Sequence, residues 1–361
     1  MLKILHILDE PWDSAITHYA LQVSELFQKQ GHQVVLALLK GKKPEKRALE
    51  KGLSVLPFVS LLELKSILSS KPWDVVNVHT GRTHTWTVLF SLLMKKKVSW
   101  AIVRTRGDAR ALSTHPLIKF IYRKTQGVIA ASQHVGEQYE QGLPLNSEQL
   151  SVIYPSVQID EKIQPYEPFT VGVLGRLDPV KGHAYFIEAA SLVLKKIPQV
   201  QFLIAGKEAN ISQSMLFNQV KVLGIEESVK FLGYVENTAD FMRRCHVGVI
   251  SSIGSEEISR ACLEWMGLGR PLVGTLVGCL SELIEPGENG FLVSPSDSTA
   301  MAVDIIKILE NKALSDSLGH QSWLLAQRKF SPQIQYEKTL GAYQQAMRNL
   351  NQPLNSRHIP G

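Results

Sequence analysis

Residues 171–182 read V-G-V-L-G-R-L-D-P-V-K-G, a β-branched run that enters a turn bounded by Gly175 and Gly182. The turn carries two cations five residues apart, Arg176 and Lys181, just before an amphipathic stretch. Glycine allows close backbone approach, arginine grips phosphate oxygens bidentately, and the start of the following helix favours an anion. We therefore predict a phosphate site, against the plain alternative of a surface loop with two solvated cations. The spacing matches neither the dinucleotide nor the P-loop pattern.

Short apolar runs alternate with amphipathic stretches along the 361 residues. The pattern predicts a β-α-β unit over Ile4–Leu8, Ala15–Gln30 and Gln33–Leu39. A second series of such units is predicted to start at Thr170. Between the two series, residues 152–169 are rich in proline and lack apolar periodicity, which indicates a linker. The predicted fold class is therefore α/β, with two domains that each have a parallel sheet. The predicted bounds are 1–165, 166–331 and a helical tail at 332–361.

Charge and cysteine content narrow the classes of function. The formal net charge is +6, and nearly all the excess lies in residues 1–165, with 21 Lys and Arg against 14 Asp and Glu. The basic clusters at 40–47, 95–97 and 119–124 would hold an anionic lipid surface or an anionic acceptor, or would simply be solvated. No aromatic residues interleave with them, which disfavours nucleic acid. Three cysteines without a C-x-x-C pair argue against a disulfide framework and a zinc site.

The first apolar run, Leu2–Leu8, is too short for a signal segment or a membrane span, and we interpret it as a buried strand. The expected location is therefore the cytoplasm.

Two carboxylates follow another short strand. Glu256 and Glu264 are eight residues apart, an offset that would rotate them about 80° apart on one continuous helix. We therefore place Glu256 in the loop at the carboxyl end of the strand, where α/β sheets bind ligands, and Glu264 on the helix that follows. The plain alternative is a pair of exposed carboxylates.

These segments resemble the "group 1" family of retaining GT-B glycosyltransferases, which are family 4-like. The resemblance is carried by Gly175-Arg176-Leu177 with Lys181-Gly182, and by Glu256-x7-Glu264 running into Gly269-Arg270-Pro271. It implies two Rossmann-like domains facing across a cleft, an acceptor domain and then a donor domain, with a C-terminal helix, 332–348, that returns to the first domain. It also implies a nucleotide-diphosphate sugar as donor substrate, no cofactor and no metal, and the sequence has no D-x-D motif.

The resemblance assigns roles to residues of the second domain. Arg176 and Lys181 would neutralise the leaving diphosphate, and Glu256 would hold sugar hydroxyls; these three form the catalytic set. The donor-binding set would be Gly175, Gly206, Tyr234, Val235, Ile258, Ser259 and Glu264.

In the first domain, the implied acceptor residues are Ser14, Ala15, His79, Arg106 and Asp108. Val103–Asp108 resembles an R-T-R-H run of an envelope-polysaccharide subgroup, but Gly107 stands where that run has histidine. Ala15 likewise replaces a glycine. On sequence alone, His79 is more often a strand-end or core histidine than a catalytic one.

We therefore expect a retaining glycosyltransferase that adds a sugar to a lipopolysaccharide core or similar envelope glycan. Its expected partners are the nucleotide sugar, a glycan or glycolipid acceptor and an anionic membrane surface on the inner face of the cytoplasmic membrane, and not nucleic acid. The alternatives are a sugar-nucleotide epimerase of the same fold and a nucleotide-sugar-binding protein that has lost catalysis.

Overall fold

The structure is a computed structural model that describes residues 1–94, 98–108, 112–143, 145–146, 148–160, 169–254 and 256–351. The chain divides into two compact units. Unit 1 consists of Met1–Ser156 and Pro332–Gly361, and unit 2 of Val157–Ser331. The boundary predicted between residues 165 and 166 and the basic cluster at 95–97 lie outside the described residues.

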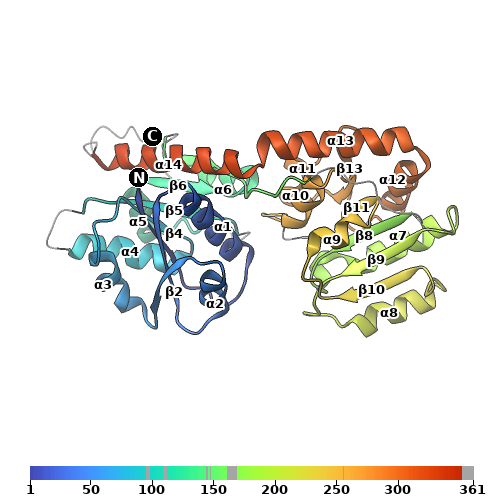
Figure 1. The fold of residues 1–361 in the computed structure, drawn as a ribbon, viewed down its shortest axis with the longest axis horizontal. Helices are drawn as coiled ribbons and strands as arrows, with labels where there is room; N and C mark the ends of the chain where they lie inside the picture. The colour runs from blue at the N-terminus through green and yellow to red at the C-terminus, as the bar shows by residue number, and fades with distance from the viewer. Residues whose placement is uncertain are drawn as a thin grey trace. The chain divides into compact units, whose positions relative to one another are not determined.

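Among its described residues, unit 1 has a seven-stranded sheet in the order β3-β2-β1-β4-β5-β6-β7, and all its paired strands are parallel (Figure 1). The strands are β1 (Lys3–Leu8), β2 (Gln33–Leu39), β3 (Ser54–Phe58), β4 (Val75–Val78), β5 (Ala101–Arg106), β6 (Gly127–Ala130) and β7 (Leu150–Val152). The helices are α1 (Ala15–Lys29), α2 (Lys43–Glu50), η1 (Leu61–Glu63), α3 (Leu64–Ser69), α4 (Gly81–Leu93), α5 (Pro116–Arg123), α6 (Gln133–Gly142) and α14 (Pro332–Asn351).

The two faces of this sheet follow from the two-residue period of a strand. Leu5 and Ile7 of β1 pack in the apolar cluster that contains side chains of α3, α4 and α5. Residues of the opposite parity, such as His6 and Asn77, therefore face the other side, which α1 and α14 cover. As a result, buried polar side chains of β1 and β4 lie on one face of the sheet.

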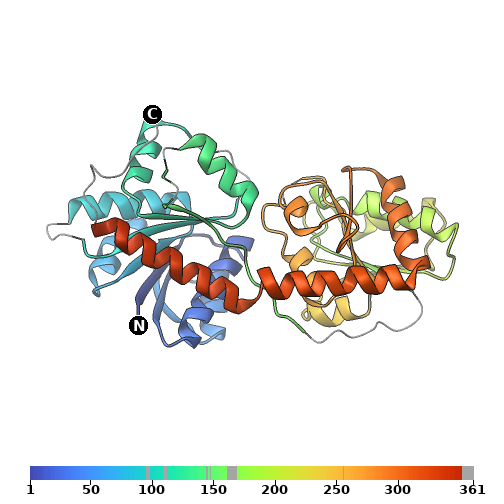
Figure 2. The ribbon, with the colours of Figure 1, turned by 90° about the horizontal axis from the view of Figure 1, so that it is seen from above.

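Helix α14 belongs to unit 1 although it is the last helix described. Figure 2 shows it in red, lying across the strands of unit 1, and it packs against α1, β5 and β6. Its buried Tyr343 accepts a hydrogen bond from the Asn77 amide at 2.7 Å, and its Asn349 donates to the Gln126 carbonyl at 3.0 Å. Gly127 leaves room for this packing, because a Cβ there would lie 3.1 Å from the Ala346 Cβ.

The described part of unit 2 has a six-stranded sheet in the order β10-β9-β8-β11-β12-β13, again parallel throughout. The strands are β8 (Thr170–Leu174), β9 (Gln201–Ala205), β10 (Val229–Gly233), β11 (Val247–Ile250), β12 (Leu272–Thr275) and β13 (Gly290–Val293). The helices are η2 (Pro179–Lys181), α7 (His183–Leu194), α8 (Gln213–Val222), α9 (Thr238–Arg243), α10 (Arg260–Gly267), α11 (Leu280–Leu283), α12 (Ser298–Glu310) and α13 (Lys312–Lys329). The predicted α/β class with two parallel sheets is confirmed.

One large side chain packs helix α10 against the sheet. The indole of Trp265 is fully buried, and it lies over Gly248 of β11 and Gly172 of β8. A Cβ on Gly248 would come within 2.4 Å of the indole ring, and one on Gly172 within 3.0 Å. Two adjacent strands therefore have glycine where α10 approaches, which lets the helix lie close to the sheet.

We expect Gly248→Ala to destabilise unit 2 by roughly 1–3 kcal/mol, because the added methyl forces the buried indole to shift in a packed core. The measurement is the thermal unfolding midpoint. The control is Gly341→Ala on α14, where a Cβ meets nothing within 4 Å and the substitution should stabilise the helix. Equal midpoints for wild type and Gly248→Ala would contradict this packing argument.

Candidate functional site

The strand order of unit 2 changes direction between β8 and β11, the point at which open α/β sheets bind ligands beyond the carboxyl ends of their strands. The loop after β8 carries Lys181, and the loop after β11 carries Glu256. The Lys181 ammonium donates to Glu256 Oε1, and the Ser252 hydroxyl donates to the same oxygen at 2.5 Å. The Glu256 side chain is 5% exposed. An ion pair with a buried carboxylate therefore lies at the switch point.

Backbone contacts hold these two loops together. Gly182 has a left-handed conformation, with φ +66°, and a Cβ there would lie 1.9 Å from the Ser251 carbonyl oxygen. The Ser251 hydroxyl donates to the Lys181 carbonyl at 2.9 Å, and the Ile253 amide donates to the Val180 carbonyl at 2.8 Å. Only glycine allows this approach, so the glycine after the lysine is explained by the contact between the loops.

Arg176 differs from Lys181 in its exposure. Its side chain is 60% exposed, and its Nε lies 3.4 Å from a carboxylate oxygen of Asp178. The Asp178 carboxylate is buried and accepts further hydrogen bonds from the Val180 amide at 3.1 Å and the Asn210 side chain at 2.7 Å. The guanidinium is thus anchored near a fixed carboxylate while most of its surface remains open to a ligand.

The glycines predicted to bind the donor lie where neighbouring strands approach closely. A Cβ on Gly206 would lie 1.8 Å from the Gly175 carbonyl oxygen, so the two backbones touch. Tyr234 and Val235 follow β10 at the same edge of the sheet. The Tyr234 ring is 61% exposed, and the Lys207 ammonium lies 3.8 Å from its centroid. This edge therefore offers an accessible aromatic face next to a cation.

The remaining donor candidates lie at the start of α10. Ser259 immediately precedes the helix, is buried, and its hydroxyl has no hydrogen-bond partner among the described residues. Ile258, half-buried, is the residue before it. Glu264 lies on α10 and accepts a hydrogen bond from Arg260 at 2.9 Å. The prediction that Glu256 lies in the loop and Glu264 on the helix is confirmed.

His183, the first residue of α7, is a site residue that the sequence reasoning missed. It is buried, and its ring lies near Gly175. Burial lowers the pKa of His183 to about 4, a larger effect than the nearby Gly175 backbone, which raises it. The only signal in the sequence was its place directly after Lys181-Gly182.

In unit 1 the strand order changes direction between β1 and β4, and His79 follows β4 there. His79 Nε2 lies 2.9 Å from Nδ1 of His6, and both rings are buried. Burial lowers the pKa of His6 to about 3. Burial, with His6 and Arg104 nearby, also lowers the pKa of His79. Both imidazoles are therefore neutral near pH 7. The sequence indicated His79 and missed its partner.

Arg106, at the end of β5, is almost fully buried and donates to Asp108 at 3.1 Å and to Gln138 at 3.1 Å. The structure thus brings two of the predicted acceptor residues together. Ser14 caps α1, where it accepts a hydrogen bond from the Thr17 amide at 3.2 Å, and Ala15 is the first residue of that helix. Ser14 therefore has a structural role that does not depend on a ligand.

Asp9 was also missed by the sequence reasoning. It follows β1 at the same edge, its side chain is 5% exposed, and it pairs with Arg82 at 2.8 Å. It also accepts a hydrogen bond from Thr80, the residue after His79.

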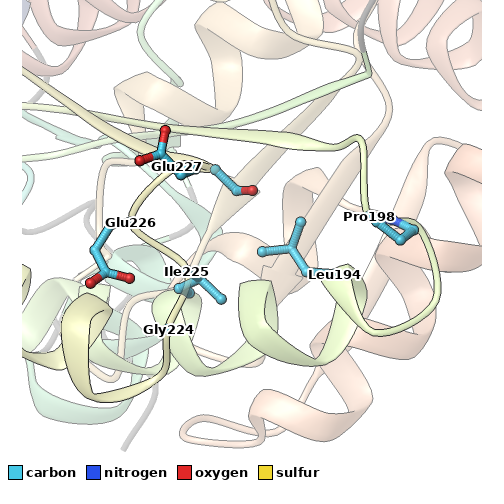
Figure 3. Close-up of a pocket in the computed structure, with 7 residues that line it drawn as sticks. Leu194, Pro198, Gly224, Ile225, Glu226 and Glu227 are labelled. Carbon is cyan, nitrogen blue, oxygen red and sulfur yellow. The ribbon is translucent and has the colours of Figure 1, made fainter.

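A hollow of about 340 Å³ lies elsewhere on unit 2 (Figure 3). It is lined by Leu194, Pro198 and residues 224–228. Leu194 ends α7 and the 224–228 segment precedes β10, so this hollow lies at the amino edge of the sheet, opposite the loops that carry Lys181 and Glu256. Two of its lining residues are Glu226 and Glu227, which disfavour a diphosphate.

No group of three or more His, Cys, Asp or Glu side chains in the described ranges is arranged to hold a metal ion. Among the helices described, none combines the length and the apolar character needed to cross a bilayer.

Two family models match the chain. "Glycosyltransferase Family 4" matches residues 16–161, and "Glycosyl transferases group 1" matches residues 168–311. The chain belongs to these glycosyltransferase families. The two matches correspond to unit 1 and unit 2, so the family assignment covers both sheets.

Curated relatives match mainly over part of their length. The phosphatidyl-myo-inositol mannosyltransferase of Mycobacterium leprae is 32% identical over 150 residues, which are 41% of this chain and 39% of that protein. An uncharacterized glycosyltransferase of Methanocaldococcus jannaschii is 24% identical over 76% of this chain and 75% of its own length. The chain thus spans less than half of the first of these relatives.

Solved structures share the fold over nearly the whole chain. Anabaena HepE in complex with UDP gives a TM-score of 0.81 at 21% identity, covering 94% of this chain and 98% of its own. A glycosyltransferase of Rickettsia africae gives 0.84 at 16% identity, covering 96% and 99%. The lipopolysaccharide outer core galactosyltransferase WaaB gives 0.76 at 15% identity, covering 94% and 99%. The predicted fold of two Rossmann-like domains is confirmed.

The buried His183 makes the stability of unit 2 depend on pH. Its pKa is about 4 in the folded protein and near 6.5 when unfolded, so between these values the unfolded state holds more protons and stability rises with pH. On acidification from pH 7 to pH 5, we expect the buried His183 to lower the free energy of unfolding by about 2 kcal/mol.

The test is chemical denaturation at both pH values. His183→Leu should lose less stability on acidification than wild type, and the control His320→Leu, which replaces an exposed histidine of the same unit, should behave as wild type does. Equal losses in His183→Leu and wild type would show that the buried imidazole does not govern this part of the acid response.

Proposed function

We propose that this chain is a glycosyltransferase that moves a sugar from a nucleotide-diphosphate sugar to an acceptor with retention of anomeric configuration. The observation that carries the proposal is the ion pair of Lys181 and Glu256 at the switch point of unit 2, with the exposed guanidinium of Arg176 on the same loop as Lys181. Unit 2 is then the donor unit and unit 1 the acceptor unit.

The cations of unit 2 suit a diphosphate in two different ways. The Arg176 side chain is mostly solvated, so it can bind a phosphate while few of its contacts with the protein are broken. Lys181 is 24% exposed and is paired with Glu256, so a phosphate oxygen that approaches it meets a partly desolvated cation. Each charge-assisted hydrogen bond contributes about 1.5–3 kcal/mol. As the bond to the sugar breaks, negative charge grows on the phosphate, and these fixed cations stabilise it most at that stage.

Glu256 suits the sugar because its carboxylate is fixed from several sides. Ser252 and Lys181 bond to its side chain, and its carbonyl accepts the Cys279 amide at 2.8 Å. A carboxylate oriented in this way can accept hydrogen bonds from sugar hydroxyls. Ser259 would add its unpartnered hydroxyl, and Glu264 would hold the ribose of the nucleotide. The cations neutralise the leaving group without a metal.

The base of the nucleotide would lie at the carboxyl end of β10, against Tyr234 and Val235. Lys207 lies over one face of Tyr234, and the ring is otherwise exposed. UDP is the first candidate, since the solved HepE structure, which shares the fold, contains UDP.

For the acceptor we propose an envelope glycan, such as a lipopolysaccharide core, reached at the inner face of the cytoplasmic membrane. WaaB, named as a lipopolysaccharide outer core galactosyltransferase, shares the fold, and the Mycobacterium leprae relative is named for a lipid acceptor. The excess of positive charge in residues 1–165 supports an anionic acceptor. His79, Arg106 and Asp108 at the carboxyl edge of unit 1 would contact it.

The experiment is a thermal shift with UDP-, GDP-, ADP- and CMP-sugars on wild type and Arg176→Ala. A ligand at 100 times its Kd stabilises the fold by about 2.7 kcal/mol. We expect one nucleotide class to stabilise wild type and Arg176→Ala to lose most of that stabilisation. The control is Arg244→Ala, an exposed arginine just after α9, at the amino edge of the same sheet. It should keep the full shift.

Turnover separates the proposed reaction from its alternatives. With the stabilising donor and an envelope glycan acceptor, the product should keep the anomeric configuration of the donor sugar, as read by NMR. A changed donor sugar without any acceptor would identify an epimerase instead. Stabilisation without turnover on any acceptor would indicate a binding protein, and no stabilisation by any nucleotide sugar would overturn the donor site.

A further inference from the structure

Helix α5 exposes large apolar side chains among basic ones. Leu117 is 49% exposed and Phe120 39% exposed, whereas Ile121 and Tyr122 of the same helix are buried. Lys119 is the residue before Phe120, and the Lys124 ammonium lies 5.7 Å from the centroid of Phe120. Residues 116–123 contain no acidic side chain. We call Leu117, Lys119, Phe120 and Lys124 the α5 surface.

The sequence around α5 is strongly one-sided in charge. Between Gly81 and Gly136 there are ten Lys and Arg residues and a single acidic residue, Asp108. Asp108 is already paired with Arg106. The neighbouring helix α4, which packs against α5, ends with the exposed Leu92 and Leu93. The two helices together therefore present apolar side chains in a region with almost no negative charge.

Two other helices with exposed apolar residues, α8 and α2, lack this combination. On α8, Met215 and Val222 are exposed, but the helix has one cation, Lys221, and is followed by Glu226 and Glu227. On α2, the exposed Leu49 lies among lysines, but Glu45 and Glu50 are on the same helix. The α5 surface thus differs from these two helices because its exposed apolar side chains lie among cations, with no acidic residue on the helix.

We propose that the α5 surface docks unit 1 on an anionic lipid bilayer. Apolar side chains flanked by lysines are the composition that binds the interface of such a membrane, with Leu117 and Phe120 entering the acyl boundary and the ammonium groups at the headgroups. A protein partner would need acidic groups around an apolar pocket, whereas a bilayer supplies both without a fitted shape.

The position of α5 connects this surface to the acceptor edge. β5 ends at Arg106 and β6 begins at the opposite edge of the parallel sheet, so α5 runs from the carboxyl edge back toward the start of β6. The amino end of α5, with Leu117, therefore lies on the side of the sheet that carries His79 and Arg106. Docking there would bring a glycolipid acceptor to that edge; this link to the acceptor rests on the proposed function, whereas docking itself does not.

The test is flotation of the full-length protein with phosphatidylcholine vesicles, with and without phosphatidylglycerol. Wild type should bind only the anionic vesicles, and binding should fall as salt rises. Lys119→Gln with Lys124→Gln should weaken binding roughly 30-fold, at about fivefold per cation. Leu117→Gln with Phe120→Gln should weaken it on the order of 100-fold. The control Met215→Gln with Val222→Gln should bind as wild type does.

Thermal shift with the nucleotide sugar, run on the same variants, separates this proposal from the proposed function. Donor stabilisation should be unchanged in both α5 variants. The docking surface would be overturned if wild type failed to bind anionic vesicles, or if the α8 control lost binding as much as the α5 variants. Either outcome would hold whether or not the nucleotide sugar stabilises the protein. A change from dimer to monomer in the α5 variants, seen by size-exclusion chromatography, would also overturn it by making the surface an interface between copies.

Discussion

A carboxylate as deeply buried as that of Glu256 is tolerated only where a cation and hydrogen-bond donors compensate for its lost hydration. Lys181 supplies the cation, and it lies 75 residues away in the chain. The loops after β8 and β11 must therefore meet for the buried carboxylate to be tolerated, and removing Lys181 would leave Glu256 buried and unpaired at a cost of about 3–5 kcal/mol. The same pairing that makes the two loops interdependent also presents a cation and a fixed carboxylate side by side. Folding of unit 2 therefore also assembles the charged pair of the proposed donor site.

The packing beneath this pair determines where α10 lies. Trp265 fills the space left by Gly172 and Gly248, so the helix lies close to the sheet and its first turn follows directly from the loop that contains Glu256. Gly278 contributes from the other side, because its left-handed backbone passes so near the Glu256 carbonyl that a Cβ would lie 2.4 Å from the oxygen. Small residues in strands and turns therefore set the geometry of the charged ones.

The repeated β-α pattern could be predicted from the sequence alone, because buried parallel strands have a composition that can be recognised locally. It also placed Glu256 and Glu264 correctly, since an offset of eight residues does not fit one helical face. It missed His6, His183 and Asp9, whose importance comes from burial and from neighbours distant in sequence. A histidine in a strand or at a helix start has no local signature of an unusual pKa; desolvation by the assembled fold produces it.

Charge is distributed differently on helix α5 and at the carboxyl edge of the sheet of unit 1. Helix α5 carries the cations Lys119 and Arg123, while the carboxyl edge of the sheet carries neutral imidazoles, His6 and His79, and a charged pair, Arg106 with Asp108. In the docking that we propose, long-range attraction to an anionic surface would come from the helix cations, because paired or neutral groups produce little field at a distance. The carboxyl edge would then discriminate among acceptors at short range through hydrogen bonds. Attraction and recognition would thus reside in different side chains, so that each could vary without loss of the other.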